Sequence, residues 1–168
     1  MAKNNKFVIA VYVENKFGVL TRVTSMFTRR GFNIDALTVG ETEDPAYSRI
    51  TISLSGDGYA REQLINQMKK LYNVKKVEVL EDGTCIKREL MLIKIQNKPE
   101  NRSDIHFAVD TYRAKVVDYT TDGMCIEVTG DPLKIDAFVE LMKPFGIIEI
   151  CRTGIVALER GNTSLLAK

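Results

Sequence analysis

Residues 15–20 (NKFGVL) combine residue types that suit the binding of a small zwitterion. Asn15 carries a side-chain carbonyl that can accept a hydrogen bond from an ammonium group, and an amide that can donate one to a carboxylate. Gly18 has no Cβ, so a ligand can approach the backbone closely at this position. If a helix begins here, its first N–H groups also form an anion site. This segment therefore indicates a site for the polar end of a free α-amino acid.

Apolar residues near this loop could line the remainder of the site. Val19 and Leu20 follow the loop directly, and Ile34 comes after a second polar segment, which ends at Asn33. Nothing here suits a charged ligand side chain, so an aliphatic amino acid is the expected ligand. The same residues also fit a simpler interpretation, a tight strand-to-helix turn and a glycine cap at the helix end. Taken alone, they favour this simpler interpretation.

Patterns for catalysis or metal binding are not found in the rest of the sequence. The three cysteines, Cys85, Cys125 and Cys151, form no C-x-x-C pair. The single histidine, His106, cannot build a zinc site alone. There is no glycine-rich phosphate loop and no nucleophile elbow. We therefore predict no catalytic residue and no metal site. These patterns do not exclude an enzyme whose pocket is assembled from residues far apart in the sequence.

The composition indicates a soluble globular protein. Of the 168 residues, 45% are hydrophobic and 27% are charged, which is the balance of a chain that folds around a core. The 24 basic and 22 acidic residues leave a net charge of +2, whereas a nucleic-acid binder normally has a concentrated basic face. No apolar run reaches the roughly 20 residues that span a bilayer, and the first residues lack a signal-peptide core. We expect a cytoplasmic protein that binds neither nucleic acid nor membrane.

Hydrophobic periodicity predicts the elements that hold the loop. Continuous or alternating apolar residues indicate strands, and apolar residues at spacings of three and four indicate helices. In the first half of the chain, the predicted strands cover residues 7–13, 32–39, 49–55 and 74–80, and the predicted helices cover 19–30 and 61–72. The order is strand, helix, strand, strand, helix, strand. The candidate loop joins the first strand to the first helix.

The same order of elements returns after a polar stretch at residues 81–88. Predicted strands cover residues 90–95, 115–119, 124–128 and 147–158, the last one broken near Thr153 and Gly154, and helices begin near Ser103 and at Asp131. We therefore expect two domains, residues 1–82 and 83–168, with a loose tail from about residue 161.

Two βαββαβ units in one chain predict an α+β fold made of two ferredoxin-like units. Each unit would place two helices on one face of a four-stranded antiparallel sheet. The other face of the sheet, or its edge, needs cover in so small a unit. Pairing with a second copy of the chain would supply that cover.

Several long segments of the sequence carry a specific resemblance. They are NKFGVLTRVTSMFTRRGFNIDALTV (15–39), DPAYSRITI (44–52), RELMLIKI (88–95) and KIDAFVELMKPFGIIEICRTGIVALERG (134–161). In this order they closely resemble the regulatory (small) subunit of acetolactate synthase, also called acetohydroxyacid synthase. The resemblance covers nearly the whole chain, and residues 96–123 are its least diagnostic part.

The resemblance implies a non-catalytic subunit whose first unit is an ACT domain. Such a subunit binds and activates a large catalytic subunit, which carries thiamine diphosphate, Mg²⁺ and FAD. It also confers feedback inhibition by branched-chain amino acids, valine foremost. ACT domains of this family form a homodimer with effector sites at the interface. The resemblance implies that one chain supplies Asn15, Gly18, Val19 and Leu20, and that the other supplies Asn33 and Ile34.

Three other functions are compatible with parts of the pattern. A stand-alone amino-acid-sensing ACT protein could control some other enzyme, although the segments after residue 88 resemble the small subunit specifically. An RNA-binding RRM domain shares the βαββαβ order, but stacking aromatic residues are missing from residues 49–55. A catalytic ferredoxin-like enzyme lacks support, because no nucleophile, metal cluster or cofactor loop is seen.

Overall fold

The computed structural model describes residues 5–165, which form two compact units. The first unit contains residues up to Ile86 together with those from Ile155 onward, and the second contains Lys87–Gly154. We expected the boundary between the two domains between residues 82 and 83. In the structure, the first unit passes into the second a few residues later, between Ile86 and Lys87, within a strand. The return of the C-terminal residues to the first unit was not expected. The assignment of a separate function to each unit stays a prediction.

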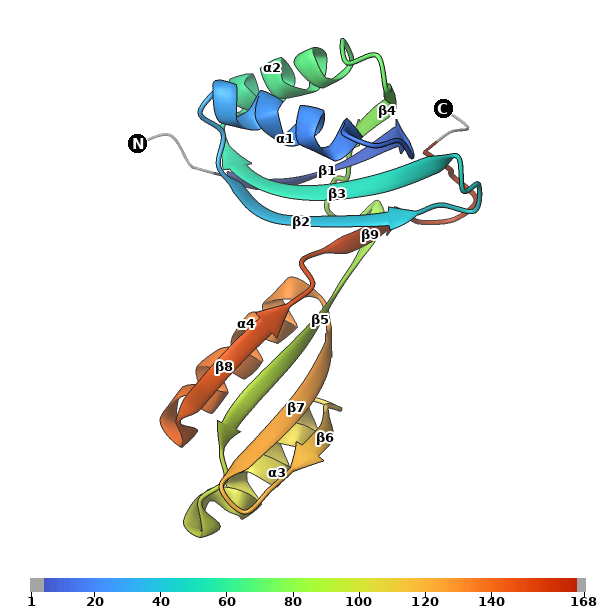
Figure 1. Cartoon of the computed structure of the whole chain (residues 1–168). Coiled ribbons are helices and arrows are strands. Elements are labelled where there is room, and N and C mark those ends of the chain that lie inside the picture. The colour runs from blue at the N-terminus through green and yellow to red at the C-terminus, as the bar shows by residue number, and fades with distance from the viewer. Residues whose placement is uncertain (1–4, 166–168) are drawn as a thin grey trace. The chain divides into compact units, whose positions relative to one another are not determined.

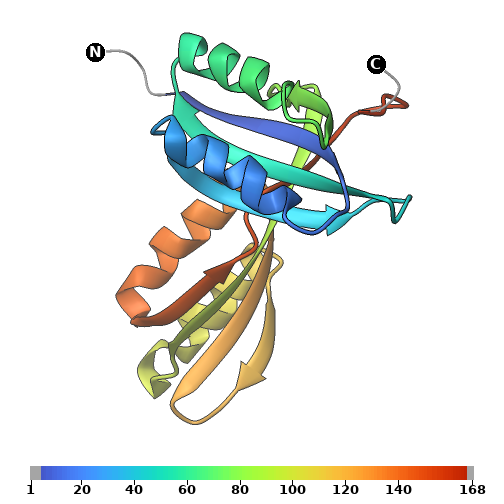
Figure 2. The ribbon, with the colours of Figure 1, turned by 45° about the horizontal axis from the view of Figure 1, so that its top comes forward.

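The first unit is a four-stranded antiparallel sheet with two helices on one face (Figures 1 and 2). Its elements are β1 (Asn5–Glu14), α1 (Val19–Arg29), β2 (Ile34–Glu41), β3 (Tyr47–Gly56), α2 (Gly58–Met68) and β4 (Val74–Val79). The strand order is β2-β3-β1-β4, which confirms the predicted ferredoxin-like arrangement. The strands β2 and β4 therefore form the two edges of this sheet.

The helices lie on the sheet because their apolar residues recur on one side. In α1, the buried residues are Val19, Val23, Met26 and Phe27, which is the spacing of a single helical face. They meet the inward side chains of β1 and β3, among them Ile9, Val11 and Ile52, in one apolar core. Asp57 caps α2, because its side chain accepts a hydrogen bond from the Ala60 N–H at 2.8 Å.

The other face of the first sheet is partly covered by the C-terminal segment. Ala157 on β9 (Val156–Glu159) and Leu165 are both 5% exposed, and they pack in a second apolar cluster with Val8, Ala10 and Tyr12. The segment expected to be a loose tail is therefore anchored as far as residue 165. Part of the cover that we assigned to a second copy of the chain comes from this segment.

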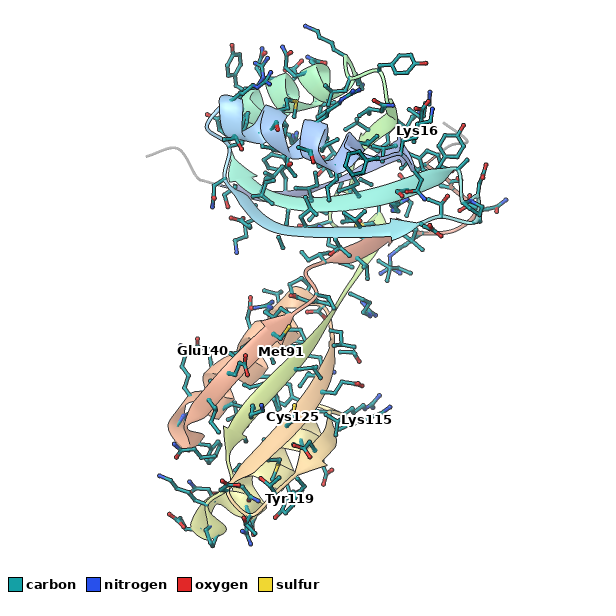
Figure 3. All side chains as sticks on the ribbon, viewed as in Figure 1. Lys16, Met91, Lys115, Tyr119, Cys125 and Glu140 are labelled. Atoms are coloured by element: carbon teal, nitrogen blue, oxygen red, sulfur yellow. The ribbon has the colours of Figure 1, made fainter. Side chains whose placement is uncertain are left out.

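The second unit repeats the arrangement. Its elements are β5 (Cys85–Gln96), a 3₁₀ turn (Pro99–Asn101), α3 (Arg102–Thr111), β6 (Lys115–Tyr119), β7 (Gly123–Gly130), α4 (Pro132–Met142), a second 3₁₀ turn (Lys143–Phe145) and β8 (Ile147–Arg152). The strand order is β6-β7-β5-β8, and its core lies between the sheet and both helices. Met91 on β5 is fully buried in this core, whereas Tyr119 and Glu140 lie at the surface (Figure 3).

The break predicted near Thr153 and Gly154 is confirmed. The strand β8 ends at Arg152, and β9 begins at Val156. Gly154 turns the chain there with φ of 78°, whereas the Thr153 N–H still donates to the Leu90 carbonyl on β5 at 3.0 Å. None of the helices within residues 5–165 is long and apolar enough to cross a membrane.

Candidate functional site

The loop between β1 and α1 ends in an open helix start. Gly18 lies in the left-handed region with φ of 78°, where glycine is strongly favoured. No side chain caps this helix, and no atom lies within 4 Å of the place where a Cβ on Gly18 would be. The Val19 N–H donates to the Lys16 carbonyl at 3.3 Å, which leaves the N–H groups of Leu20 and Thr21 as the first-turn donors without a partner inside the helix. A carboxylate fits there by geometry and by the helix dipole.

Asn15 is held differently from our expectation. Its side-chain amide donates to Glu41 Oε1 at 3.1 Å and to the Pro45 carbonyl at 3.0 Å. Because this amide is engaged within the chain, these two bonds would have to open before it could donate to a ligand carboxylate, and that role stays a prediction. The carbonyl of Asn15 accepts no hydrogen bond from the described residues, and the Glu41 carboxylate lies beside it. This end of the loop suits an ammonium group, and the helix start suits the carboxylate.

A polar network holds the start of the loop in place. Glu14 accepts from Lys75 Nζ at 2.7 Å, from Lys16 Nζ at 3.1 Å (Figure 3) and from the Asn73 amide at 2.7 Å. Asn73 in turn accepts from Arg22 Nη1 at 2.8 Å, which ties the first turn of α1 to the same network. The loop is therefore positioned from β1, α1 and the segment before β4.

This network lowers the pKa of Glu14 from 4.5 to about 2, chiefly through its hydrogen bond with Lys75 and then through those with Lys16 and Asn73. A carboxyl group with a lowered pKa stabilises the fold above its unfolded pKa, and this contribution disappears as the pH falls toward its folded pKa. The window for Glu14 is therefore between pH 4.5 and about 2.

We expect Glu14→Gln to reduce stability at neutral pH and to flatten its pH dependence between pH 4.5 and about 2. Urea titrations across that range would measure the change in the free energy of unfolding. Glu62→Gln, at an exposed position of α2, is the matched control and should keep the wild-type slope. Equal slopes for wild type and Glu14→Gln would contradict this role of the network.

The apolar residues of the predicted site divide into two groups. Val19 is 4% exposed and belongs to the core beneath α1, so its side chain does not line a ligand pocket. Leu20 is 41% exposed and stays available. Phe17 was missed, although it is fully solvent-exposed in the middle of the loop. A lone aromatic residue in a short loop was the available signal, although a single exposed ring by itself does not mark an interface.

Asn33 and Ile34 lie at the other end of α1. Asn33 is exposed, and Ile34 is partly buried at the start of β2. A helix of 11 residues is about 16 Å long, so these residues are too far from Gly18 to touch the same small ligand within one chain. The structure thus brings Asn15, Gly18 and Leu20 together, and it places Asn33 and Ile34 apart from them.

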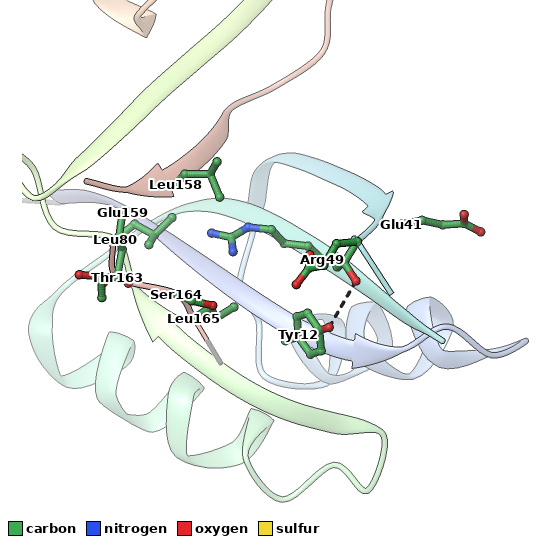
Figure 4. A pocket seen from close by; sticks show the side chains of 11 residues that line it. Tyr12, Glu41, Arg49, Leu80, Leu158, Glu159, Thr163, Ser164 and Leu165 are labelled. Atoms are coloured by element: carbon green, nitrogen blue, oxygen red, sulfur yellow. Dashed lines mark hydrogen bonds between the residues drawn. The ribbon is translucent and has the colours of Figure 1, made fainter. Parts of the chain in front are cut away.

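A cavity of about 400 Å³ lies under the C-terminal segment (Figure 4). Tyr12, Arg49 and Glu159 line it, and burial lowers the pKa of the Arg49 guanidinium. Arg49 Nη2 donates to the Ala157 carbonyl at 2.8 Å, and the Tyr12 hydroxyl pairs with Thr42 Oγ1 at 3.3 Å. The bond from Arg49 to Ala157 fastens β9 to the sheet. Within residues 5–165, no group of three or more His, Cys, Asp or Glu side chains could hold a metal ion.

Comparison with known proteins agrees with this architecture. The family model described as the AHAS small subunit-like ACT domain matches residues 9–76, and the one for the small subunit of acetolactate synthase matches residues 88–161. A probable acetolactate synthase small subunit from Archaeoglobus fulgidus is 48% identical over 157 residues, covering 94% of this chain and 98% of that one. The chain belongs to the acetolactate synthase small-subunit family.

Other members of the family are similar to the chain over nearly the same share of its length. The acetolactate synthase small subunit of Bacillus subtilis is 43% identical over 158 residues, covering 94% of this chain and 92% of that protein. The crystal structure of the small subunit from Thermotoga maritima superposes with a TM-score of 0.86 at 38% identity, covering 95% and 99% of the two chains. The first unit is thus an ACT domain. As a member of this family, the chain is a regulatory subunit and is itself non-catalytic.

Proposed function

We propose that this small subunit binds and activates the catalytic subunit of acetolactate synthase and makes it sensitive to branched-chain amino acids, valine foremost. The effector would bind between the ACT domains of two chains. One observation carries this proposal: Asn15 and Gly18 lie in one exposed loop at the start of α1, whereas the other predicted contacts, Asn33 and Ile34, lie too far away to reach the same small ligand in the same chain.

The position of β2 supports a site shared between two chains. β2 is an edge strand of the first sheet, so its outer N–H and C=O groups are available for pairing. Its start, Ile34, and its end, Glu41, are about 23 Å apart at the usual rise of a strand. Antiparallel pairing of two such edges about a twofold axis places the start of one strand beside the end of the other.

The loop of each chain lies at the Glu41 end of its own β2, because Asn15 bonds to Glu41 and Pro45. In the paired arrangement, Asn33 and Ile34 of the second chain would therefore approach Asn15 and Gly18 of the first. The exposed rings and aliphatic groups of Phe17 and Leu20 would become covered at this junction. A ligand bound there contacts both chains and so has a different affinity for each dimer geometry, which is the requirement for allosteric control.

The chemistry of the site supports a small aliphatic amino acid. The open start of α1 suits the carboxylate, and the Asn15 carbonyl with the Glu41 carboxylate suits the ammonium group. Leu20 and Ile34 offer apolar contact to a branched side chain. Thiamine diphosphate, Mg²⁺ and FAD would belong to the catalytic partner, and the complex would act in the cytoplasm.

Calorimetric titration of the purified chain with valine, with lysine as the control ligand, tests the effector site. We expect saturable binding of valine at about one ligand per chain, since a twofold dimer has two equivalent sites. The activity of the catalytic subunit should rise on addition of the chain and fall again with valine. Valine binding without any effect on that activity would favour the alternative, a stand-alone sensor that controls another enzyme.

A mixing experiment distinguishes a shared site from a site within one chain. Gly18→Asp and Asn33→Trp should each bind valine poorly as pure proteins. In a mixed dimer, one site receives both changes and the other receives none. Mixing equal amounts, with exchange of chains, should therefore restore about a quarter of the sites. No recovery of valine binding after demonstrated exchange would show that the site is not shared.

A further inference from the structure

A basic groove lies between α1 and α2, on the outer side of the helices of the first unit. It has a volume of about 560 Å³. Arg22, Arg29 and Arg30 line it from α1 and the residue that follows, and Lys70 lines it from the segment after α2. No acidic side chain lines this groove, and α1 contains no Asp or Glu. A local excess of four positive charges is therefore set in a chain whose net charge is only +2.

These cations are not neutralised by the fold. Within residues 5–165, Arg29, Arg30 and Lys70 form no ion pair, and Arg22 donates to the neutral side chain of Asn73 at 2.8 Å. Other cations of the same unit are paired: Arg61 lies 3.1 Å from Glu81, and Lys75 lies 2.7 Å from Glu14. Concentrated and unpaired positive charge attracts an acidic partner over a distance of about 10 Å at moderate salt.

The floor of the groove favours a protein over a nucleic acid as the partner. Leu71, with the small exposed part of Met26, supplies apolar surface between the cations, and arginine beside apolar side chains is typical of protein interfaces. No aromatic ring lines the groove, whereas single-stranded nucleic acids are bound by stacking on aromatic side chains. A second copy of the chain cannot bind there by the same groove, because two grooves facing each other would repel.

We propose that this basic groove docks an acidic surface segment of the catalytic subunit. The inference rests on the proposed function, which supplies the partner, and adds the surface and the charge by which that partner is recognised. The groove is walled by α1, whose two ends carry the candidate effector residues Gly18 and Asn33. A shift of α1 on effector binding would then change the geometry of the docking surface directly.

Reversing charge in the groove tests the proposal. We expect Arg29→Glu/Arg30→Glu to weaken binding to the purified catalytic subunit at least about 30-fold at low salt, because facing like charges oppose association. Lys70→Glu, on the opposite wall, should weaken it less but in the same direction. The wild-type affinity should fall as salt increases. Surface-immobilised catalytic subunit and the full chain in solution are the components of this assay.

The matched control is Lys98→Glu/Lys115→Glu, which makes the same change in net charge at exposed positions of the second unit. It should keep wild-type affinity within about threefold. Thermal unfolding of each variant shows whether it is folded. Equal weakening by control and test variants would overturn the proposal, since net charge alone would then explain the effect. Unchanged affinity of the test variants would also overturn it.

Two further outcomes identify other failures. If the wild-type chain does not bind the catalytic subunit at all, the proposed function fails, and the docking proposal fails with it. If the groove variants bind the catalytic subunit normally but lose affinity for a single-stranded 20-nucleotide probe that the wild type binds, the groove is a nucleic-acid site instead. Binding that is lost only in the groove variants, with the catalytic subunit as ligand, supports the proposal.

Discussion

The variant Gly18→Asp should fold normally and lose valine binding. The new carboxylate would occupy the open start of α1, where the carboxylate of the effector is expected. Like charges placed together cost several kcal/mol, so we expect affinity to fall at least about 100-fold. Folding should survive because Asp is among the few residues that adopt the left-handed conformation, and nothing lies within 4 Å of the new Cβ. Calorimetry with valine measures the effect.

Two controls separate charge from backbone strain. Gly18→Asn has nearly the same shape and the same tolerance of φ of 78°, but no charge, and should lose less than about tenfold in affinity. Gly83→Asp introduces the same charge and strain at φ of 88°, far from the site, and should bind valine like the wild type. Normal valine binding by Gly18→Asp would mean that the helix start is not the carboxylate site.

Asn33→Ala should weaken valine binding less than Gly18→Asp does. The change removes one exposed polar side chain without introducing a charge, and a single hydrogen bond contributes about 0.5–1.5 kcal/mol. The expected loss in affinity is therefore about two- to tenfold. Calorimetric titration with valine under the same conditions gives the comparison, and a larger loss than that of Gly18→Asp would reverse the assigned roles.

The element order could be predicted from sequence because it rests on local periodicity. The alternating apolar residues of β3 and the single apolar face of α1 each point to one core. The same periodicity could have corrected one site residue: Val19 shares its helical face with Val23 and Phe27, and is buried with them. Its neighbour Leu20 falls outside that face, which is why only Leu20 remains available to a ligand.

Contacts between distant residues could not be predicted. The amide of Asn15 is engaged by Glu41 and Pro45, which are 26 and 30 positions away, and no local pattern encodes that pairing. Likewise, no periodicity in the C-terminal segment indicates that this segment packs on the sheet of the first unit. Leu165 packs there against apolar residues of the sheet. Arg49 also donates a hydrogen bond to Ala157, which lies 108 positions farther along the chain.

In the second unit, Arg152→Ala should cause the largest loss of stability among the variants considered. Arg152 Nε and Nη2 donate to the two carboxylate oxygens of Glu89, both at 2.7 Å, and Nη1 donates to Asp136 Oδ1 at 2.7 Å. The side chain of Glu89 is only 4% exposed, so removal of the guanidinium leaves a buried charge without its partner. We expect a loss of about 3 kcal/mol, at the lower end for buried pairs because Arg152 itself is partly exposed.

Urea titration would measure that loss, and hydrogen exchange at the β5 and β8 amides would localise it. Asp136→Asn should cost at most about 1 kcal/mol, because Asp136 is 57% exposed and solvent screens its attraction to Arg152. Replacing both partners, as Glu89→Leu/Arg152→Leu, should recover most of the stability, since no unpaired buried charge then remains. Glu89 and Asp136 bond to the same guanidinium. The expected difference in stability loss between Arg152→Ala and Asp136→Asn therefore depends on how deeply each carboxylate is buried. If Arg152→Ala proved as mild as Asp136→Asn, the pair with Glu89 would be dispensable for folding, and Arg152 would become a candidate contact for a partner.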